Sequence, residues 1–229
     1  MLHTEQTVLD SVRNREGKRV FYLGKNDRLT PGARDLLSRQ RIEILPAEQA
    51  ASAEYRLLSG GYLKEKPEEM THLSGNILVP KSHPRIAFRG AVDTLEAELL
   101  LCQKDEKEPL FGQLGEILEF TRLLIRWDVM DEPVKWERLC GLTAGELRSH
   151  SHRPQDFYGQ PHFMPRVTDS ATVLRLNKCR CAARSAELAA VRAFTDENGT
   201  ATRQDLLQAM NRLSSMLYIL MIREKAKER

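Results

Sequence analysis

The stretch that decides the fold is residues 163–187, which read FMPRVTDSATVLRLNKCRCAARSAE. Thr168, Asp169 and Ser170 carry side-chain oxygens of the kind that cap the first turn of a helix. The residues after Ser170 include no Gly or Pro before Gly199. The pattern therefore predicts a helix of roughly seven turns that begins near Ser170.

Three charged side chains share one face of this predicted helix. Arg180, Arg184 and Glu187 stand at positions i, i+4 and i+7, a spacing that brings side chains onto the same face. Two guanidiniums one turn apart, with a carboxylate to hold one of them, form a forked donor array suited to a polyphosphate. The alternative is a solvated face with an ordinary surface ion pair, and the spacing alone leaves both open.

Composition narrows the class of protein. The chain has 229 residues, of which 29% are charged and 41% hydrophobic, and no segment approaches the roughly 18 apolar residues that span a bilayer. The formal net charge is +3, with basic and acidic residues interleaved, so we expect neither a nucleic-acid partner nor membrane insertion. The N-terminus lacks a basic start followed by an apolar run, which predicts a cytoplasmic protein.

Four cysteines are too scattered for a disulfide framework: Cys102, Cys140, Cys179 and Cys181. Cys179 and Cys181 lie two apart in the predicted helix and so point in different directions, which favours core packing over metal binding. His150 and His152 form at most half a metal site, and surface or hydrogen-bonded histidines are the other interpretation.

An acidic cluster stands near the middle of the chain, at Asp128, Asp131 and Glu132. Its carboxylates are of the type that binds Mg²⁺. Solvation of a loop and helix capping are the alternative interpretation, and the residues alone do not exclude either.

Helical periodicity recurs over residues 93–101, 110–129, 142–150 and 202–224. The last of these opens with a capping-box pattern, Thr202-x-x-Asp205. Residues 19–23, 30–39 and 42–45 instead predict a small strand–helix–strand unit, and residues 47–69 a polar connecting segment. We therefore expect a mainly α protein, with an N-terminal accessory region and linker over residues 1–65 and a helical bundle over residues 66–229.

Several blocks of sequence resemble a known family. Residues 176–187 fit an L-x-x-x-R-x-x-x-R-x-x-E helix, and residues 210–214 (MNRLS) stand where an L-N-R-L-S helix follows. Residues 66–73, 78–85 and 88–93 extend the match upstream. The chain resembles the EutT-type corrinoid adenosyltransferases, which are related to the PduO-type ATP:cob(I)alamin adenosyltransferases. That resemblance implies a five-helix bundle that transfers the 5′-deoxyadenosyl group of ATP to a reduced corrinoid.

The resemblance also implies roles for residues around the triphosphate. Lys81 matches the lysine of the phosphate loop, and with Arg180 and Arg184 it is expected to stabilise the negative charge of the leaving triphosphate. Glu187 is expected to orient an arginine, and Asn211 to hold the nucleotide. Mg²⁺ is expected to accompany ATP.

Two further roles concern an interface and the corrinoid. Asp93 is expected to pair with an arginine, Arg184, across a subunit interface, and to take part in catalysis with it. Phe163 is expected to lie beneath the corrin of cob(II)alamin, where an apolar side chain displaces the lower axial ligand before reduction to cob(I)alamin.

The chain departs from the family pattern at several places. EutT-type proteins of the enteric kind carry H-x11-C-C-x2-C in the region of residues 47–69, whereas this chain has no cysteine before Cys102. An iron or zinc site of that type cannot form, and we predict no metal ligands. Ala87 stands where a glutamate is usual and Glu96 where an asparagine is usual, and the glycine-rich phosphate loop of the wider family is not recognisable.

The resemblance extends to partners. It implies a homo-oligomer, a trimer or a dimer, with active sites at subunit interfaces. Ethanolamine ammonia-lyase or its reactivation machinery is the expected recipient of the product, and association with a bacterial microcompartment is a further expectation. Two alternatives stay open: a non-catalytic corrinoid- or nucleotide-binding carrier that delivers coenzyme to a lyase, and an adenosyltransferase that serves another lyase.

Overall fold

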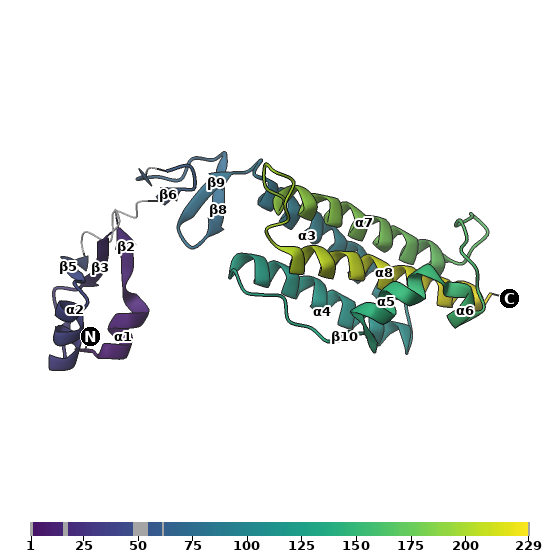
Figure 1. Cartoon of the computed structure of the whole chain (residues 1–229), viewed down its shortest axis with the longest axis horizontal. Coiled ribbons are helices and arrows are strands. Elements are labelled where there is room, and N and C mark those ends of the chain that lie inside the picture. The colour runs from purple at the N-terminus through teal and green to yellow at the C-terminus, as the bar shows by residue number, and fades with distance from the viewer. Residues whose placement is uncertain (1, 16–17, 48–54, 61, 229) are drawn as a thin grey trace. The chain divides into compact units, whose positions relative to one another are not determined.

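The structure is a computed structural model that describes residues 2–15, 18–47, 55–60 and 62–228 (Figure 1). Two units are compact within themselves: Met1–Glu68 with Asn76–Leu78, and Glu69–Gly75 with Val79–Arg229. The predicted domain boundary between residues 65 and 66 stays a prediction. Over the described ranges, no helix has the length and hydropathy needed to cross a membrane.

The first unit contains the strand–helix–strand motif that the sequence predicts. Strand β3 (Lys18–Leu23) leads to helix α2 (Pro31–Arg39) and then to β5 (Glu43–Pro46). The two strands pair in parallel, with Val20 opposite Glu43, as expected for strands joined by a helical crossover. The Thr30 hydroxyl accepts a hydrogen bond from the Ala33 N–H and caps α2. This part of the fold prediction is confirmed.

The first unit has further short elements, of which β9 continues into the second unit. The helix is α1 (Glu5–Ser11), and the strands are β1 (Leu2–His3), β2 (Arg13–Arg15), β4 (Arg28–Leu29), β6 (Tyr55–Leu57), β7 (Tyr62–Leu63) and β9 (Ile77–Pro80). Strand β6 pairs antiparallel with β7 and parallel with β9. The prediction of a plain connecting segment over residues 47–69 is therefore wrong for β6 and β7. The partner of β6 lies some twenty residues downstream, where a local pattern does not reveal it.

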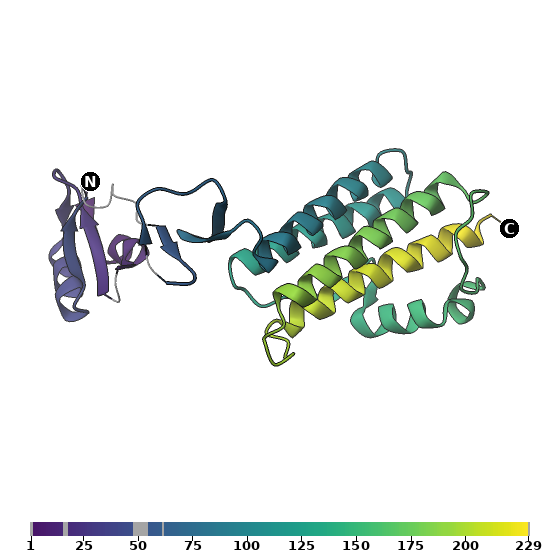
Figure 2. The same cartoon turned by 90° about the horizontal axis from the view of Figure 1, so that it is seen from above.

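The second unit is a helical bundle. Its helices are α3 (Pro84–Gln103), α4 (Leu110–Val129), α5 (Ala144–His152), α6 (Pro154–Tyr158), α7 (Ala171–Ala193) and α8 (Gln204–Ala226). Its short strands are β8 (Met70–Ser74), β10 (Arg138–Leu139) and β11 (Leu142–Thr143). Helices α3, α4, α7 and α8 run side by side, and α5 packs against α8 (Figure 2). The predicted mainly α, five-helix bundle is confirmed.

Small side chains let α7 approach its neighbours closely. Its buried residues include Cys179, Ala183, Ala186 and Ala190, and α7 packs against both α3 and α8. Helix α8 buries large apolar side chains on several sides, such as Met210, Leu213 and Leu217, as expected for a helix with neighbours on more than one side. A polar side chain of α7 also meets α3, where Lys178 pairs with Glu98 at 2.9 Å.

Side-chain caps begin α1, α2, α3, α5 and α7, whereas α4, α6 and α8 have no side-chain cap. The Ser170 hydroxyl accepts from the Val173 N–H at 3.3 Å and caps α7, which confirms the predicted start. The capping box predicted at the start of α8 is wrong, because the Thr202 hydroxyl donates to the Phe194 carbonyl oxygen. The Asp205 carboxylate instead accepts from the Val134 N–H at 2.9 Å and pairs with Arg203 at 3.0 Å.

Candidate active site

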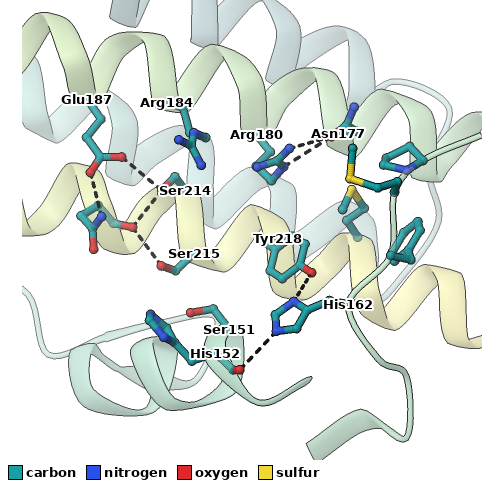
Figure 3. Close-up of a pocket in the computed structure, with 15 residues that line it drawn as sticks. Ser151, His152, His162, Asn177, Arg180, Arg184, Glu187, Ser214, Ser215 and Tyr218 are labelled. Carbon is teal, nitrogen blue, oxygen red and sulfur yellow. Dashed lines mark hydrogen bonds between the residues drawn. The ribbon is translucent and has the colours of Figure 1, made fainter. Parts of the chain in front are cut away.

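A cavity of about 690 Å³ opens between α7, α8, the end of α5 and the loop that precedes α7 (Figure 3). This volume falls in the range of small-molecule sites in proteins. The lining residues are Ser151, His152, His162, Phe163, Met164, Pro165, Asn177, Arg180, Arg184, Glu187, Asn211, Ser214, Ser215, Tyr218 and Met221. The wall therefore combines two arginines with amide, hydroxyl and aromatic groups.

Arg180 and Arg184 both line the cavity from α7, as their spacing of one turn predicts. The Arg180 guanidinium donates to Asn177 Oδ1 at 3.1 Å, and its carbon lies 5.8 Å from the centre of the Tyr218 ring. Among the described residues, no carboxylate lies within ion-pair distance of either arginine. Two guanidiniums without acidic partners give the cavity a positive wall that attracts an anionic ligand.

Glu187 lines the same cavity, but its partner differs from the expected one. Its Oε1 accepts from Asn211 Nδ2 at 2.7 Å, and its Oε2 accepts from the Ser214 hydroxyl at 3.4 Å. The expectation that Glu187 orients an arginine is not met in this structure. Because α8 packs alongside α7, the carboxylate meets the amide of Asn211, while Arg184 stays exposed at the cavity.

Arg212 fixes the orientation of the Asn211 amide, a contact that the sequence reasoning missed. Arg212 is only 8% exposed and its Nη1 donates to Asn211 Oδ1 at 2.6 Å. The amide oxygen thus faces Arg212, and the amide nitrogen faces Glu187. Burial lowers the pKa of Arg212, and the charge of nearby Arg148 lowers it further. In the sequence, only the position of Arg212 directly after Asn211 pointed to this contact.

Phe163 lies on the loop between α6 and α7 and is half-buried at the cavity. The Lys225 ammonium lies 5.9 Å from the centre of its ring. Lys225 in turn pairs with Asp169 at 2.8 Å, and Asp169 also accepts from the Arg166 N–H at 2.7 Å. The hydrogen bond from Lys225 lowers the pKa of Asp169. These contacts hold the loop at its C-terminal end.

Tyr218, His162 and Asn177 join the site without having been predicted. Asn211, Ser214, Ser215 and Tyr218 stand at i, i+3, i+4 and i+7 on α8, and all four line the cavity. This polar stripe within an apolar helix was a usable signal for Tyr218. No comparable pattern marked His162, whose place depends on the path of the loop.

Lys81 and Asp93 do not line the cavity. Lys81 precedes α3 and is exposed, and its backbone N–H donates to the Glu69 carbonyl oxygen at 2.8 Å. Asp93 is exposed on α3 and forms no ion pair with the described residues. The structure therefore brings Phe163, Arg180, Arg184, Glu187 and Asn211 together in one chain and leaves Lys81 and Asp93 outside.

The acidic cluster at the end of α4 divides into different environments. Asp128 is fully buried, and its carboxylate accepts from Arg85 Nε at 2.8 Å and from Arg89 Nε at 2.7 Å. Arg85 also donates to the Asp128 carbonyl oxygen at 2.7 Å. Asp131 is exposed and lies 3.5 Å from Arg203. Both interpretations of Asp128, as a Mg²⁺ ligand or a solvated loop residue, are wrong, because a carboxylate sequestered by two guanidiniums serves neither.

Within the ranges that the structure describes, no three His, Cys, Asp or Glu side chains come together as metal ligands. His150 accepts or donates a hydrogen bond with the Tyr158 hydroxyl at 2.7 Å and stacks on Phe157, which matches the interpretation of a hydrogen-bonded histidine. Cys179 is buried, as the core-packing interpretation predicts, whereas Cys181 is exposed, so that interpretation is wrong for Cys181. Metal independence itself stays a prediction.

Residues 61–224 match the family described as cobalamin adenosyltransferase. The chain belongs to that family. It is 31% identical to the corrinoid adenosyltransferase EutT of Salmonella typhimurium over 93% of this chain and 88% of that protein. It is 29% identical to EutT of Escherichia coli K12 over the same shares of the two chains.

Solved structures agree at the level of the fold. A variant of the PduO-type ATP:corrinoid adenosyltransferase from Lactobacillus reuteri, complexed with cobalamin and ATP, superposes with a TM-score of 0.51. The match covers 80% of this chain and 92% of that chain at 16% identity. A second variant of the same enzyme, also complexed with cobalamin and ATP, gives a TM-score of 0.50 at 17% identity. At such identity the likeness establishes the helical fold alone.

Proposed function

We propose that this protein is an ATP:cob(I)alamin adenosyltransferase that transfers the 5′-deoxyadenosyl group of ATP to a reduced corrinoid. The observation that carries the proposal is the pair Arg180 and Arg184, which line the cavity without acidic partners among the described residues. The same cavity is lined by Phe163, from the loop that precedes α7. Family membership supports the same activity. ATP and the corrinoid are both substrates, and Mg²⁺ accompanies ATP.

The chemistry is a nucleophilic displacement at carbon. Two electrons of cob(I)alamin form the cobalt–carbon bond to the 5′ carbon of ATP, and the electrons of the carbon–oxygen bond leave with the triphosphate. The nucleophile carries no proton, so no side-chain base is required. The enzyme gains rate by stabilising the charge that develops on the leaving oxygen, which is the role proposed for Arg180 and Arg184. Lys81 is proposed to add a third cation at the triphosphate.

Glu187 and Asn211 are proposed to hold the nucleoside part of ATP. Their hydrogen bond of 2.7 Å joins α7 to α8 beside the arginines. Arg212 holds Asn211 Oδ1, so the amide cannot rotate without losing two contacts. A pre-oriented carboxylate accepts from hydroxyl donors such as those of ribose, and an amide N–H donates to ring-nitrogen acceptors such as those of adenine.

Phe163 is proposed to contact the lower face of the corrin. A half-buried aromatic ring at the rim of the cavity excludes water and offers cobalt no ligand atom. A cobalt atom without its lower ligand is easier to reduce, so this residue acts on cob(II)alamin before the transfer itself.

The position of Lys81 and Asp93 outside the cavity supports a homo-oligomer with interfacial active sites. Two apolar side chains that stand three residues apart on α7, Leu188 and Val191, are 63% and 43% exposed. Adjoining exposed apolar side chains on one helix are typical of a surface covered by a partner. A second copy, in a dimer or trimer, is proposed to bring its Asp93 to Arg184 and its Lys81 to the triphosphate.

Subunit mixing tests this arrangement. Asp93→Ala and Arg184→Ala variants are each expected to be nearly inactive, whereas a mixture exchanged between subunits contains sites with both native residues. In a trimer or dimer with shared sites, random assortment of equal amounts leaves about a quarter of the sites with both native residues, so mixing is expected to restore about a quarter of the wild-type activity. Mixtures that stay as inactive as the separate variants would contradict an interfacial site.

The lyase that receives the product is proposed to be ethanolamine ammonia-lyase, with its reactivation machinery and a bacterial microcompartment as the setting. The similarity to EutT proteins over most of the chain supports this assignment. One alternative is an adenosyltransferase whose product serves another lyase. The other alternative is not an enzyme but a carrier, which binds ATP or corrinoid without converting them.

An anaerobic assay tests the activity directly. Purified protein is treated with a strong chelator of iron and zinc, returned to Mg²⁺, and given ATP and chemically reduced cob(I)alamin. We expect adenosylcobalamin to form at the rate of untreated protein, because the chain lacks the cysteine cluster of the enteric relatives. If the rate falls after chelation and zinc or ferrous iron restores it, the prediction that the enzyme needs neither metal is wrong. Binding of ATP and corrinoid without conversion would favour the carrier.

A further inference from the structure

The loop between α6 and α7 is fastened to two helices by one imidazole. His162 Nδ1 lies 2.6 Å from the Tyr218 hydroxyl of α8, and His162 Nε2 lies 3.2 Å from the His152 carbonyl oxygen at the end of α5 (Figure 3). The His162 and Tyr218 rings also stack, with an interplanar angle of 14°. The loop thus meets α5 and α8 at the residue directly before Phe163.

These partners determine where the protons lie. A carbonyl oxygen only accepts, so the bond to His152 requires a proton on His162 Nε2. In the neutral ring Nδ1 is then unprotonated and accepts from the Tyr218 hydroxyl. Both ring nitrogens are occupied in this arrangement. His162 therefore offers no free nitrogen to a ligand in the cavity.

Tyr218 also contacts the positive wall of the cavity. The Arg180 guanidinium lies over the Tyr218 ring, 5.8 Å from its centre, in the geometry of a cation–π contact. Burial raises the pKa of the Tyr218 hydroxyl, and Arg180 lowers it only in part, so the hydroxyl keeps its proton near neutral pH. One tyrosine thus touches the α7 arginine through its ring and the Phe163 loop through its hydroxyl.

We propose that Tyr218 and His162 are positioning residues that hold the Phe163 loop at a fixed place beside the cavity, against the lower face of the corrin. This inference rests on the proposed function. The other end of the loop is held independently by the Asp169–Lys225 ion pair at 2.8 Å. Without the hydroxyl of Tyr218, His162 keeps its longer hydrogen bond to His152 and its ring stacking but loses the hydrogen bond of 2.6 Å, and Phe163 samples positions away from the corrin.

Tyr218→Phe separates the two roles of the tyrosine, because it removes the hydroxyl and keeps the ring under Arg180. The chain supplies a matched control in Tyr158→Phe, since Tyr158 bonds to His150 Nδ1 at 2.7 Å but does not line the cavity. Activity is measured with pre-reduced cob(I)alamin and, separately, with cob(II)alamin plus a reductant.

We expect Tyr218→Phe to lose roughly 2- to 10-fold in rate with cob(II)alamin, as befits one hydrogen bond, and less than twofold with cob(I)alamin. Phe163→Ala is expected to show the same split with a larger loss, and Tyr158→Phe to match wild type with both substrates. Amide hydrogen exchange of residues 160–166, measured without substrates, is expected to be faster in Tyr218→Phe than in Tyr158→Phe.

Three outcomes overturn the proposal: unchanged exchange of the loop, equal behaviour of Tyr218→Phe and Tyr158→Phe, or an equal loss with both corrinoid states. The last would assign the hydroxyl to the ATP side of the cavity. Failure of wild-type protein to convert cob(I)alamin would instead overturn the proposed function. The exchange measurement would then still decide whether the hydroxyl holds the loop.

Discussion

Arg184→Ala is expected to lower kcat/KM by roughly 10²- to 10³-fold, the loss typical when one group that stabilises a developing charge is removed. Arg184 lines the cavity, is exposed to it and has no acidic partner among the described residues. Its charge is therefore available to the triphosphate and is not needed for folding. The measurement is anaerobic steady-state conversion of cob(I)alamin with ATP.

Arg184→Lys tests whether geometry or charge matters, and we expect it to recover only part of the activity, because an ammonium lacks the planar fork of a guanidinium. Arg192→Ala is the matched control: Arg192 lies in the last turn of α7 and does not line the cavity. Its activity is expected to equal that of wild type. If Arg184→Ala keeps more than half of the wild-type kcat/KM, the residue has no part in catalysis and a carrier becomes the better interpretation.

Asp128→Ala is expected to lower the free energy of unfolding by about 3–5 kcal/mol, as for a buried ion pair that loses one partner. The carboxylate is fully buried and neutralises Arg85 and Arg89, which are themselves 24% and 15% exposed at their side chains. Its removal leaves two poorly solvated guanidiniums beside each other at the start of α3. The measurement is urea unfolding followed by circular dichroism.

Asp131→Ala provides the control for this stability prediction. The Asp131 side chain is 88% exposed and lies 3.5 Å from Arg203, so its loss is expected to cost less than about 1 kcal/mol. If Asp128→Ala lowers the free energy of unfolding as little as Asp131→Ala does, water reaches the Arg85–Asp128–Arg89 network. The loss in free energy of unfolding for Asp128→Asn is expected to lie between those for Asp128→Ala and Asp131→Ala, because the amide keeps the shape of the carboxylate and loses its charge.

The bundle helices could be predicted because the residues that determine each helix lie close together in the sequence. Residues 110–129 carry apolar side chains at helical spacing, and α4 has those bounds in the structure. The start of α7 followed from Ser170, a side chain that caps the turn directly after it. The start of α8 was mispredicted because Asp205 bonds to Val134 and Arg203 rather than to its own helix end.

The pairing of strands β6 and β9 could not be predicted from short windows of sequence. Arg56 pairs with Ile77 and Leu57 with Leu78, so each strand depends on a partner outside any short window. The strand–helix–strand motif was easier to predict, because an apolar run, a capped helix and a second apolar run follow one another in the chain.

By itself, the sequence determined the helices, the face shared by Arg180, Arg184 and Glu187, and the family, since periodicity and motif spacing are properties of a single segment. Only the tertiary structure decided which groups meet: Glu187 with Asn211, Arg212 with Asn211, and His162 with Tyr218. These contacts join side chains 24 and 56 residues apart in two of the three cases. Their formation depends on how α7, α8 and the loop pack, and that packing results from burying apolar surface across the whole bundle.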